Sequence, residues 1–260
     1  MGDMRLSPPT IDASIVDQYH QQGYIVVEGL VSPSEVDGLR QRTSDIADGR
    51  VRYPNDRIEI EPGADEISLA TVRKINKCAD SDPVFLAHAK HERILDVVEA
   101  LIGPDIKLFS SQCFMKPPGG IEKAYHQDSA YFCIEPMALV TCWTALDDVT
   151  IENGPLWVIP ASQHRGLVDH SEKWMVRDRQ DRKVPDALID RESAQPIVMP
   201  AGSCSFHHSL LLHGSTPNRS NRSRRGMAVH YMTAASRWTD VAKPMPQYEL
   251  LRGREYEQCV

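Results

Sequence analysis

Several features that mark other protein classes are missing from this sequence. Its six cysteines form no Cys-x-x-Cys pair, so neither a zinc ribbon nor a thioredoxin-like redox site is indicated. No stretch matches the Gly-x-Ser-x-Gly elbow of serine hydrolases, the Gly-x-Gly-x-x-Gly turn of dinucleotide-binding folds or the phosphate-binding P-loop. The sequence therefore lends no support to these enzyme classes.

Positive charge and long apolar stretches are scarce as well. The 29 lysine and arginine residues are outnumbered by 36 aspartate and glutamate residues, for a net charge of −7, and such a field favours neither nucleic acid nor an anionic membrane. The longest largely apolar run, 137–146, falls well short of the ~20 residues that a membrane helix needs, and no secretion signal is visible. We expect a cytoplasmic protein with reduced cysteines that binds small molecules; the sequence does not indicate its oligomeric state.

The most informative motif is His126-Gln127-Asp128. In extended backbone, residues i and i+2 point to the same side, so the imidazole and the carboxylate can bind one metal ion while Gln127 points away. A His-x-Asp tripeptide on a protein surface is also a common accident. A second histidine from a distant strand would place two histidines and one carboxylate on one face of the ion, which is the ligand set of non-haem Fe(II) oxygenases.

The candidates for the second histidine lie further along the chain. An arginine fork is well shaped for the distal carboxylate of the cosubstrate 2-oxoglutarate. Arg224 follows His213 by eleven residues, and Arg219 follows His208 by the same distance. Arg219 lies among turn-forming residues, whereas Arg224 opens a β-like run. This context favours His213, with His207 and His208 making hydrogen bonds in the core. Spacing alone does not exclude the pair His208 and Arg219, and one of the two histidines stays open as the ligand.

Three stretches are distinctive when they are taken together. They are His126-Gln127-Asp128, the segment 152–160 with the sequence ENGPLWVIP, and His213-Gly214-Ser215 followed by Arg224. Together they resemble the phytanoyl-CoA dioxygenase family of Fe(II)/2-oxoglutarate oxygenases, over about residues 24–231. The resemblance implies iron ligands at His126, Asp128 and His213. It also implies 2-oxoglutarate contacts at Arg224 and Ser215 and suggests further contacts at Lys77, Gln112 and Trp143, where Gln112 replaces a methionine of some relatives.

The resemblance implies an enzyme that uses Fe(II), 2-oxoglutarate and O2 to oxidise a small organic substrate, with release of succinate and CO2. Because Asp128 fills the position of the carboxylate ligand, hydroxylation is expected rather than halogenation, with desaturation, epoxidation and ring formation as open outcomes. The residues leave the substrate undetermined. They also leave open a jelly-roll protein that binds a small molecule or a divalent metal without redox chemistry, since a fold alone does not decide function.

Helical patterns are concentrated in the first part of the chain. Residues 11–22 and 82–102 have helical periodicity. Ser32 and Glu35 form a capping-box pattern that predicts the start of another helix. The intervening segment 48–69, rich in charge, proline and glycine, is expected to be a mobile surface segment that borders a pocket.

Short β-like runs dominate from residue 106 onward. Separated by proline, glycine and asparagine turns, they are typical of a mainly β fold, a double-stranded β-helix (jelly roll, cupin-like) with helices packed outside it. We expect a single domain over 1–260, with a helical part at about 11–103, a jelly-roll core at about 106–233 and a charged substrate lid at 165–196. The runs are 106–115, 139–146, 156–159, 197–199, 203–207, 209–212 and 226–232, preceded by an isolated run at 24–27.

Overall fold

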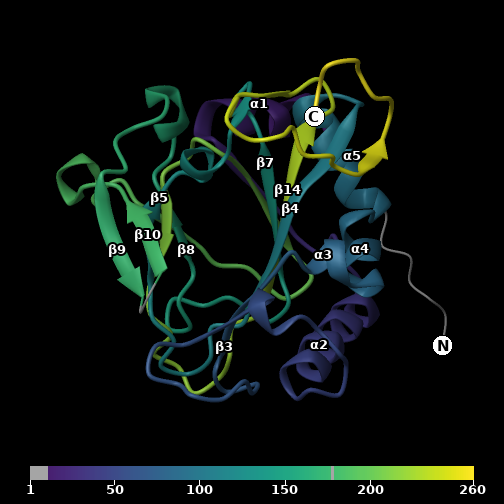
Figure 1. Cartoon of the computed structure of the whole chain (residues 1–260). Helices are drawn as coiled ribbons and strands as arrows, with labels where there is room; N and C mark the ends of the chain where they lie inside the picture. The colour runs from purple at the N-terminus through teal and green to yellow at the C-terminus, as the bar shows by residue number, and fades with distance from the viewer. Residues whose placement is uncertain (1–10, 177–178) are drawn as a thin grey trace.

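A broad antiparallel sheet runs through the middle of the molecule, with helices on one side of it and a smaller sheet and a hairpin on the other (Figure 1). The computed structural model describes residues 11–176 and 179–260, so residues 1–10 of the expected domain and 177–178 of the expected lid lie outside it. Two sheets that bury their facing sides against each other form the predicted jelly roll with flanking helices.

The larger sheet draws its strands from the whole length of the chain. All six residues of β7 (Val140–Ala145) are buried, as are seven of the eight residues of β14 (Gly226–Thr233). These central strands are buried on both faces because α5 packs on one face of the sheet and the smaller sheet lies on the other. In spatial order the strands are β1 (Tyr24–Val27), β12 (Cys204–His208), β7, β14, β4 (Ile106–Phe114), β3 (Val72–Asn76) and β2 (Ile58–Ile60), with β16 (Leu250–Arg252) paired to β4.

The smaller sheet and two hairpin-like pairs make up the remaining β structure of the described residues. The smaller sheet has the order β11 (Gln195–Ile197), β8 (Leu156–Val158), β13 (His213–Ser215) and β5 (Lys123–His126). A separate hairpin pairs β9 (Glu172–Val176) with β10 (Arg179–Lys183), and β6 (Ile134–Glu135) pairs with β15 (Arg237–Trp238).

Local capping signals fix the first helices where the sequence predicts them. The Asp12 carboxylate accepts backbone hydrogen bonds at the start of α1 (Ala13–Gln22), and Gly23 ends that helix in the left-handed region with φ 82°. The reciprocal capping box of Ser32 and Glu35 opens α2 (Pro33–Ala47). The later helices are α3 (Cys78–Ser81), α4 (Pro83–Ala89) and α5 (Glu92–Ile102).

The single helix expected over 82–102 is wrong. The chain breaks between α4 and α5, where His91 adopts extended backbone with φ −61° and ψ 119°. The break redirects the chain so that Phe85 of α4 and Ile94 of α5, both fully buried, reach the same core. Packing of two short apolar faces against the sheet therefore outweighs continuous helical periodicity.

The strand expected over 209–212 is also wrong. These residues form a turn in which the backbone nitrogens of Leu210 and Leu211 donate to the Nδ1 atom and the carbonyl oxygen of His208, at 3.0 Å and 2.8 Å. The run is apolar because Leu211 and Leu212 are fully buried, not because the chain is extended there. The run at 197–199 is displaced, since β11 ends at Ile197.

Two segments without clear periodicity contain ordered structure. The segment 48–69 holds η1 (Asn55–Arg57) and the edge strand β2. Its Glu59 and Glu61 line a cavity, so the segment borders a pocket as expected. The expected lid segment 165–196 holds the β9–β10 hairpin and η4 (Asp186–Leu188), and its Asp181 lines the same cavity.

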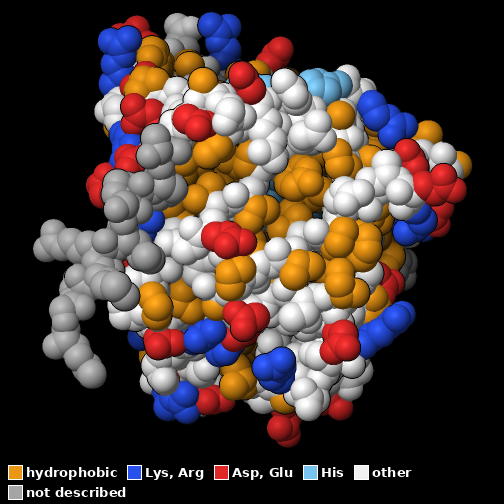
Figure 2. All heavy atoms as spheres, turned by 180° about the vertical axis from the view of Figure 1, so that it is seen from behind, with side chains coloured by type: hydrophobic (Ala, Val, Ile, Leu, Met, Phe, Trp, Pro, Cys, Tyr) orange, Lys and Arg blue, Asp and Glu red, His pale blue; other side chains and the backbone are white. Residues whose placement is uncertain are grey.

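Charges of both signs are intermixed on the face shown in Figure 2. Lysine and arginine side chains lie there in small groups among aspartate and glutamate, while apolar side chains gather toward the middle of the face. This face thus presents no continuous basic surface of the kind that binds nucleic acid. None of the helices in 11–176 or 179–260 has the length and apolar character needed to cross a membrane.

Candidate metal centre

A cavity of about 250 Å³ is lined by strands of both sheets. Its walls come from β3, β4, β7, β12 and β14 of the larger sheet and from β5, β8 and β13 of the smaller one. Segments far apart in the sequence therefore meet in one enclosed space, which is the usual form of a small-molecule site.

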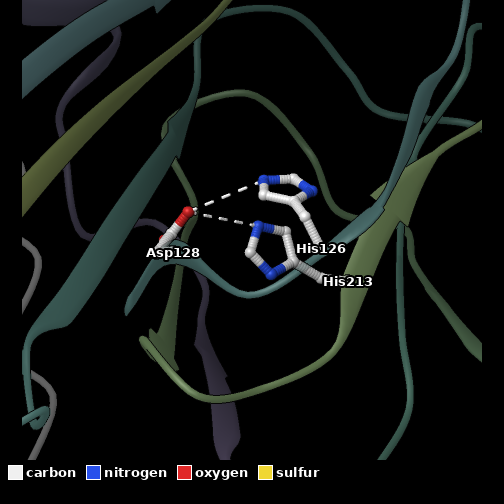
Figure 3. Close-up of side chains that lie close together, drawn as sticks. All are labelled: His126, Asp128 and His213. Carbon is white, nitrogen blue, oxygen red and sulfur yellow. Dashed lines mark ion pairs between the residues drawn. The ribbon is translucent and has the colours of Figure 1, made fainter. Parts of the chain in front are cut away.

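Strand pairing brings the sequence-predicted metal ligands together. β13 pairs with β5 so that His213 lies opposite His126, and Asp128 follows at the start of η2 (Asp128–Tyr131). One ligand atom from each of the three residues lies within 4.8 Å of the other two. Figure 3 shows both imidazoles pointing toward the carboxylate, and each Nε2 lies 3.7 Å from Asp128 Oδ1. Two nitrogens and one oxygen thus face a common point, as a metal ion requires.

Each of these histidines is oriented through its other ring nitrogen. The Nδ1 atoms of His126 and His213 lie 2.9 Å and 3.0 Å from the carbonyl oxygens of Ala124 and Leu211. A carbonyl oxygen only accepts hydrogen bonds, so Nδ1 carries the proton and Nε2 keeps its lone pair. Burial lowers the pKa of His126 well below its ordinary value and that of His213 to about 4. Both rings are therefore neutral at pH 7, the form that binds metal.

The two oxygens of Asp128 have different surroundings. Oδ1 faces the two histidines, whereas Oδ2 accepts a hydrogen bond of 2.8 Å from Thr141 Oγ1. The Nε2 atoms of His207 and His230 each lie 3.6 Å from Oδ2. Burial alone would raise the pKa of Asp128, but the surrounding histidines, His213 foremost, hold it well below its ordinary value. The ionised carboxylate is thus anchored by one oxygen and offers the other.

The rival histidines His207 and His208 face opposite sides of β12. His207 lines the cavity, and neither of its ring nitrogens has a hydrogen-bond partner among the described residues, so the core hydrogen bond expected for this residue is wrong. His208 turns away and accepts a hydrogen bond of 3.0 Å from the backbone of Leu210. The group of three residues around a common point contains His213 and neither of these two.

Gln127, between the ligands His126 and Asp128, is also held in place by hydrogen bonds. The Gln127 side chain points away from the cavity and donates to the carbonyl oxygens of Gly166 and Leu210, at 2.8 Å and 2.6 Å. Its backbone nitrogen donates to Nε2 of His170 at 2.9 Å. His170 belongs to a second His-x-acid tripeptide, completed by Glu172, so this tripeptide supports the backbone of the site and takes no part in lining the cavity.

Arg224, the predicted cosubstrate residue, is only 3% exposed and lines the cavity. Its Nη2 donates to the carbonyl oxygen of Gly154 at 2.7 Å, and its guanidinium lies 5.1 Å from the centroid of the Trp143 ring. Its Nε has no hydrogen-bond partner, and no described carboxylate pairs with it. Burial lowers the pKa of Arg224 to about 10, so it is charged at pH 7. A buried guanidinium without an acidic partner is suited to an anionic ligand.

Gly154, in the segment 152–160, sits where three chain segments approach closely. Its φ is +81°, and a Cβ there would lie 2.4 Å from the carbonyl oxygen of Thr216 and 3.0 Å from Lys116 Cδ. Glycine is therefore required for the carbonyl of residue 154 to reach the Arg224 guanidinium.

The predicted cosubstrate contacts are not all brought to the cavity. Ser215 lines it, as do Gln112 on β4 and Trp143 on β7. Lys77 does not: β3 ends one residue before it, and Lys77 lies exposed at the start of α3 with φ 51°. The lysine of this segment that lines the cavity is Lys74.

Several cavity residues are absent from the sequence-based prediction. Alternation along the strands would have found two of them, because Thr141 lies two residues before Trp143 on β7 and His230 lies two residues after Ala228 on β14, and all four line the cavity. Lys116 has no such signal, since it lies beyond the end of β4. Its burial depends on contacts with Ser215 at the end of β13 and with Thr216 after it.

Comparison with known proteins agrees with this geometry. The family model described as Phytanoyl-CoA dioxygenase (PhyH) matches residues 19–226. A relative named probable phytanoyl-CoA dioxygenase, from Caenorhabditis elegans, is 30% identical over 234 residues, which cover 82% of this chain and 72% of the relative. The chain belongs to the phytanoyl-CoA dioxygenase family. As a member it is a 2-oxoglutarate-dependent non-haem iron dioxygenase, and Fe(II) and 2-oxoglutarate are its cofactor and cosubstrate.

Other members of this wider group carry different names. L-proline trans-4-hydroxylase from Streptomyces griseoviridis is 29% identical over 248 residues, which cover 88% of each chain. The crystal structure of EctD from S. alaskensis with 2-oxoglutarate and 5-hydroxyectoine matches with a TM-score of 0.75 at 25% identity, covering 96% of this chain and 86% of that one. Proteins similar to this chain thus carry names that refer to different small molecules, so family membership does not determine the substrate.

Proposed function

We propose that His126, Asp128 and His213 hold Fe(II) and that Arg224 and Ser215 bind the distal carboxylate of 2-oxoglutarate. The observation that carries the proposal is that three ligand atoms converge within 4.8 Å in the cavity that also contains a buried arginine without an acidic partner. Bound iron supplies oxygen activation coupled to the oxidative decarboxylation of 2-oxoglutarate to succinate. The chain supplies ligands, orientation and a confined space.

The cavity wall orients the cosubstrate. The Trp143 ring lies against the Arg224 guanidinium and restricts its plane. Gln112 lies opposite Ala228 in the pairing of β4 with β14, so its amide faces the same space. We place Gln112 and Trp143 in the wall of the 2-oxoglutarate site on these contacts, whereas the position of Lys77 supports no such role.

The substrate we favour is a small polar molecule that the enzyme hydroxylates. A cavity of about 250 Å³ is small for a site that also holds the cosubstrate, and L-proline trans-4-hydroxylase is a relative whose name gives a small charged substrate. Hydroxylation is the expected outcome because Asp128 occupies the carboxylate position of the ligand set. Cavity-lining ion pairs support a polar substrate: Lys74–Glu59 at 3.1 Å, Arg73–Glu61 at 3.5 Å and Lys123–Asp181 at 2.6 Å.

The organisation of the chain and its location are part of the proposal. Pairing of β1 with β12 and of β3 with β4 joins the helical part, about 11–103, to the β-rich part, about 106–233, which supports one domain. All six cysteines are free, and four of them are buried, which supports the reducing cytoplasm. Fractionation of cells that produce the tagged protein tests the location.

The function is tested by two measurements on the purified protein. Addition of 2-oxoglutarate to the anaerobic Fe(II) protein is expected to produce a visible absorbance band. In air, succinate should then form only when both Fe(II) and 2-oxoglutarate are present, and stimulation by fractions of a metabolite extract would identify the substrate. Binding of either ligand without any succinate would instead indicate a non-redox binding protein.

A further inference from the structure

Lys116 is a buried lysine whose amine has no carboxylate partner among the described residues. Its residue is 7% exposed, and its Nζ donates to Ser215 Oγ at 2.8 Å and to the carbonyl oxygen of Thr216. Within the part of the chain that the structure describes, no carboxylate oxygen lies within 4.0 Å of this nitrogen. A charged ammonium held only by a hydroxyl and a carbonyl is poorly compensated for its loss of water.

A backbone hydrogen bond holds Lys116 beside Arg224. The backbone nitrogen of Arg224 donates to the carbonyl oxygen of Lys116 at 3.1 Å, and both side chains line the cavity. Gly154 brings them together from the other side, because its carbonyl accepts from Arg224 and its missing Cβ leaves room for the Lys116 stem. Two basic side chains that pair with no carboxylate of the described residues, Lys116 and Arg224, therefore converge with the Ser215 hydroxyl on one wall of the cavity. This arrangement suits a carboxylate with two oxygens.

We propose that Lys116 is a second cation for the distal carboxylate of 2-oxoglutarate and binds it together with Ser215 and Arg224. The proposal rests on the function proposed above. If Lys116 has this role, binding of 2-oxoglutarate is coupled to the uptake of one proton, because the arriving carboxylate favours the ammonium form of Lys116. The proton comes from solvent and binds to Nζ.

The charges around Lys116 support this proton uptake. Burial, followed by the neighbouring charges of Arg224 and Arg73, lowers the pKa of Lys116 to about 6, against the opposite influence of Glu61 and Glu122. Most of the cosubstrate-free protein therefore has a neutral amine at pH 7.5. Between this pKa and the higher pKa of the complex, the affinity for 2-oxoglutarate should fall about tenfold per pH unit.

The test is calorimetric titration of the anaerobic Fe(II) protein with 2-oxoglutarate, in pairs of buffers with different ionisation enthalpies. The wild type is expected to take up close to one proton per site at pH 7.5. Lys116→Met should remove this uptake and weaken binding at pH 6.5 by about 10- to 100-fold, the range for losing a hydrogen bond to a charged group. Lys116→Arg carries a permanent charge, so it should keep the affinity and lose the uptake.

Lys107 provides the matched control. It is a buried lysine on β4, 5% exposed, which pairs with Glu255 at 3.0 Å and does not line the cavity. Lys107→Met should bind 2-oxoglutarate with the affinity and proton uptake of the wild type.

Three outcomes would overturn the proposal for Lys116. They are a wild type that binds 2-oxoglutarate without proton uptake, a Lys116→Met protein with unchanged affinity and uptake, and a Lys116→Arg protein with unchanged uptake. If circular dichroism shows that Lys116→Met does not fold, the proton uptake of Lys116→Arg tests the proposal in its place. A wild type that fails to bind 2-oxoglutarate at all would instead contradict the proposed function itself.

Discussion

Arg224 and Arg225 are neighbours in the chain with opposite surroundings. Arg224 faces the cavity, whereas the Arg225 guanidinium donates two hydrogen bonds of 2.8 Å to the Asp147 carboxylate. Arg224→Ala is expected to weaken 2-oxoglutarate binding by ~2–5 kcal/mol, as for the loss of one partner of a buried charge pair, and to leave Fe(II) binding nearly unchanged. Arg225→Ala should keep the cosubstrate affinity. Equilibrium titration checks both variants, and a larger effect of Arg225→Ala would reverse the assignment.

The third metal ligand can be tested by a second pair of residues. His213→Ala is expected to abolish stoichiometric Fe(II) binding and succinate formation, because only one histidine and one carboxylate of the group remain. His208→Ala is the control, since His208 turns away from the cavity. Metal analysis after desalting measures the effect. Full iron content in His213→Ala would move the third ligand to His207 or His230, whose Nε2 atoms each lie 3.6 Å from Asp128 Oδ2.

At the residue scale, the sequence predicts the parts of the site that follow from local geometry. The i, i+2 rule is sufficient to bring His126 and Asp128 to one side, because Gln127 between them is extended, with φ −118° and ψ 135°. The position of Lys77 is not predictable in this way, since it depends on where β3 ends. Lys116 becomes buried through contacts with Gly154 and with Ser215 and Thr216 at the end of β13, about a hundred residues away in sequence.

At the element scale, end signals are more informative than apolar periodicity. The capping box of Ser32 and Glu35 opens α2 as predicted, and α1 ends at Gln22, where the run 11–22 ends, because capping hydrogen bonds and a positive φ at Gly23 act within a few residues. The helix expected over 82–102 and the strand expected over 209–212 are both predicted from apolar residues. Such residues indicate which positions are buried, but they do not specify the backbone conformation. Long-range packing decides between the alternatives in such runs.

The β9–β10 hairpin is attached to the cavity wall by charge. Lys123 of β5 pairs with Asp181 of β10 at 2.6 Å, and Lys123 and Arg73 lie 5.2 Å and 5.4 Å from the centroid of the Trp174 ring. Burial lowers the pKa of Lys123, so removing its acidic partner should further disfavour the ammonium at this position. Asp181→Asn is therefore expected to speed amide hydrogen exchange in both strands of the hairpin, as measured by mass spectrometry.

Asp186 gives this prediction its control. It pairs with Arg191 at 2.7 Å and, within the same turn of chain, with Lys183 of β10 at 3.6 Å. Its side chain is 65% exposed, and surface pairs of this kind contribute little. Asp186→Asn should leave the exchange of β9 and β10 unchanged. Identical exchange in the two variants would show that the Lys123–Asp181 pair does not hold the hairpin.

At the scale of the whole molecule, the cavity depends on the complete sheet arrangement. Its lining extends from Glu59 on β2 to His230 on β14, so the site forms only when distant segments have paired. Any ligand that binds this cavity and not the unfolded chain stabilises the whole fold by mass action. The charge state of a cavity residue must likewise influence the free energy of unfolding.

The charge state of Lys116 should make the free energy of unfolding depend on pH. Its pKa is about 6 in the folded protein and ~10.4 in an unfolded chain. Between these values unfolding takes up a proton, so this residue makes the free energy of unfolding rise with pH, by up to ~1.4 kcal/mol per pH unit. Below pH 6 the lysine is protonated in both states, and the folded protein bears the full penalty of burying the charge.

Lys116→Met should remove this dependence. Urea unfolding of the metal-free proteins between pH 6.5 and 8.5 is expected to show the wild type gaining stability with pH relative to Lys116→Met, because the titrating groups that the two proteins share contribute equally to both profiles. In the Fe(II)-loaded anaerobic wild type, saturating 2-oxoglutarate should flatten the dependence by keeping Lys116 charged. Parallel pH profiles for the two metal-free proteins would show that Lys116 stays protonated when the protein folds, and proton uptake on cosubstrate binding would then have to come from another residue.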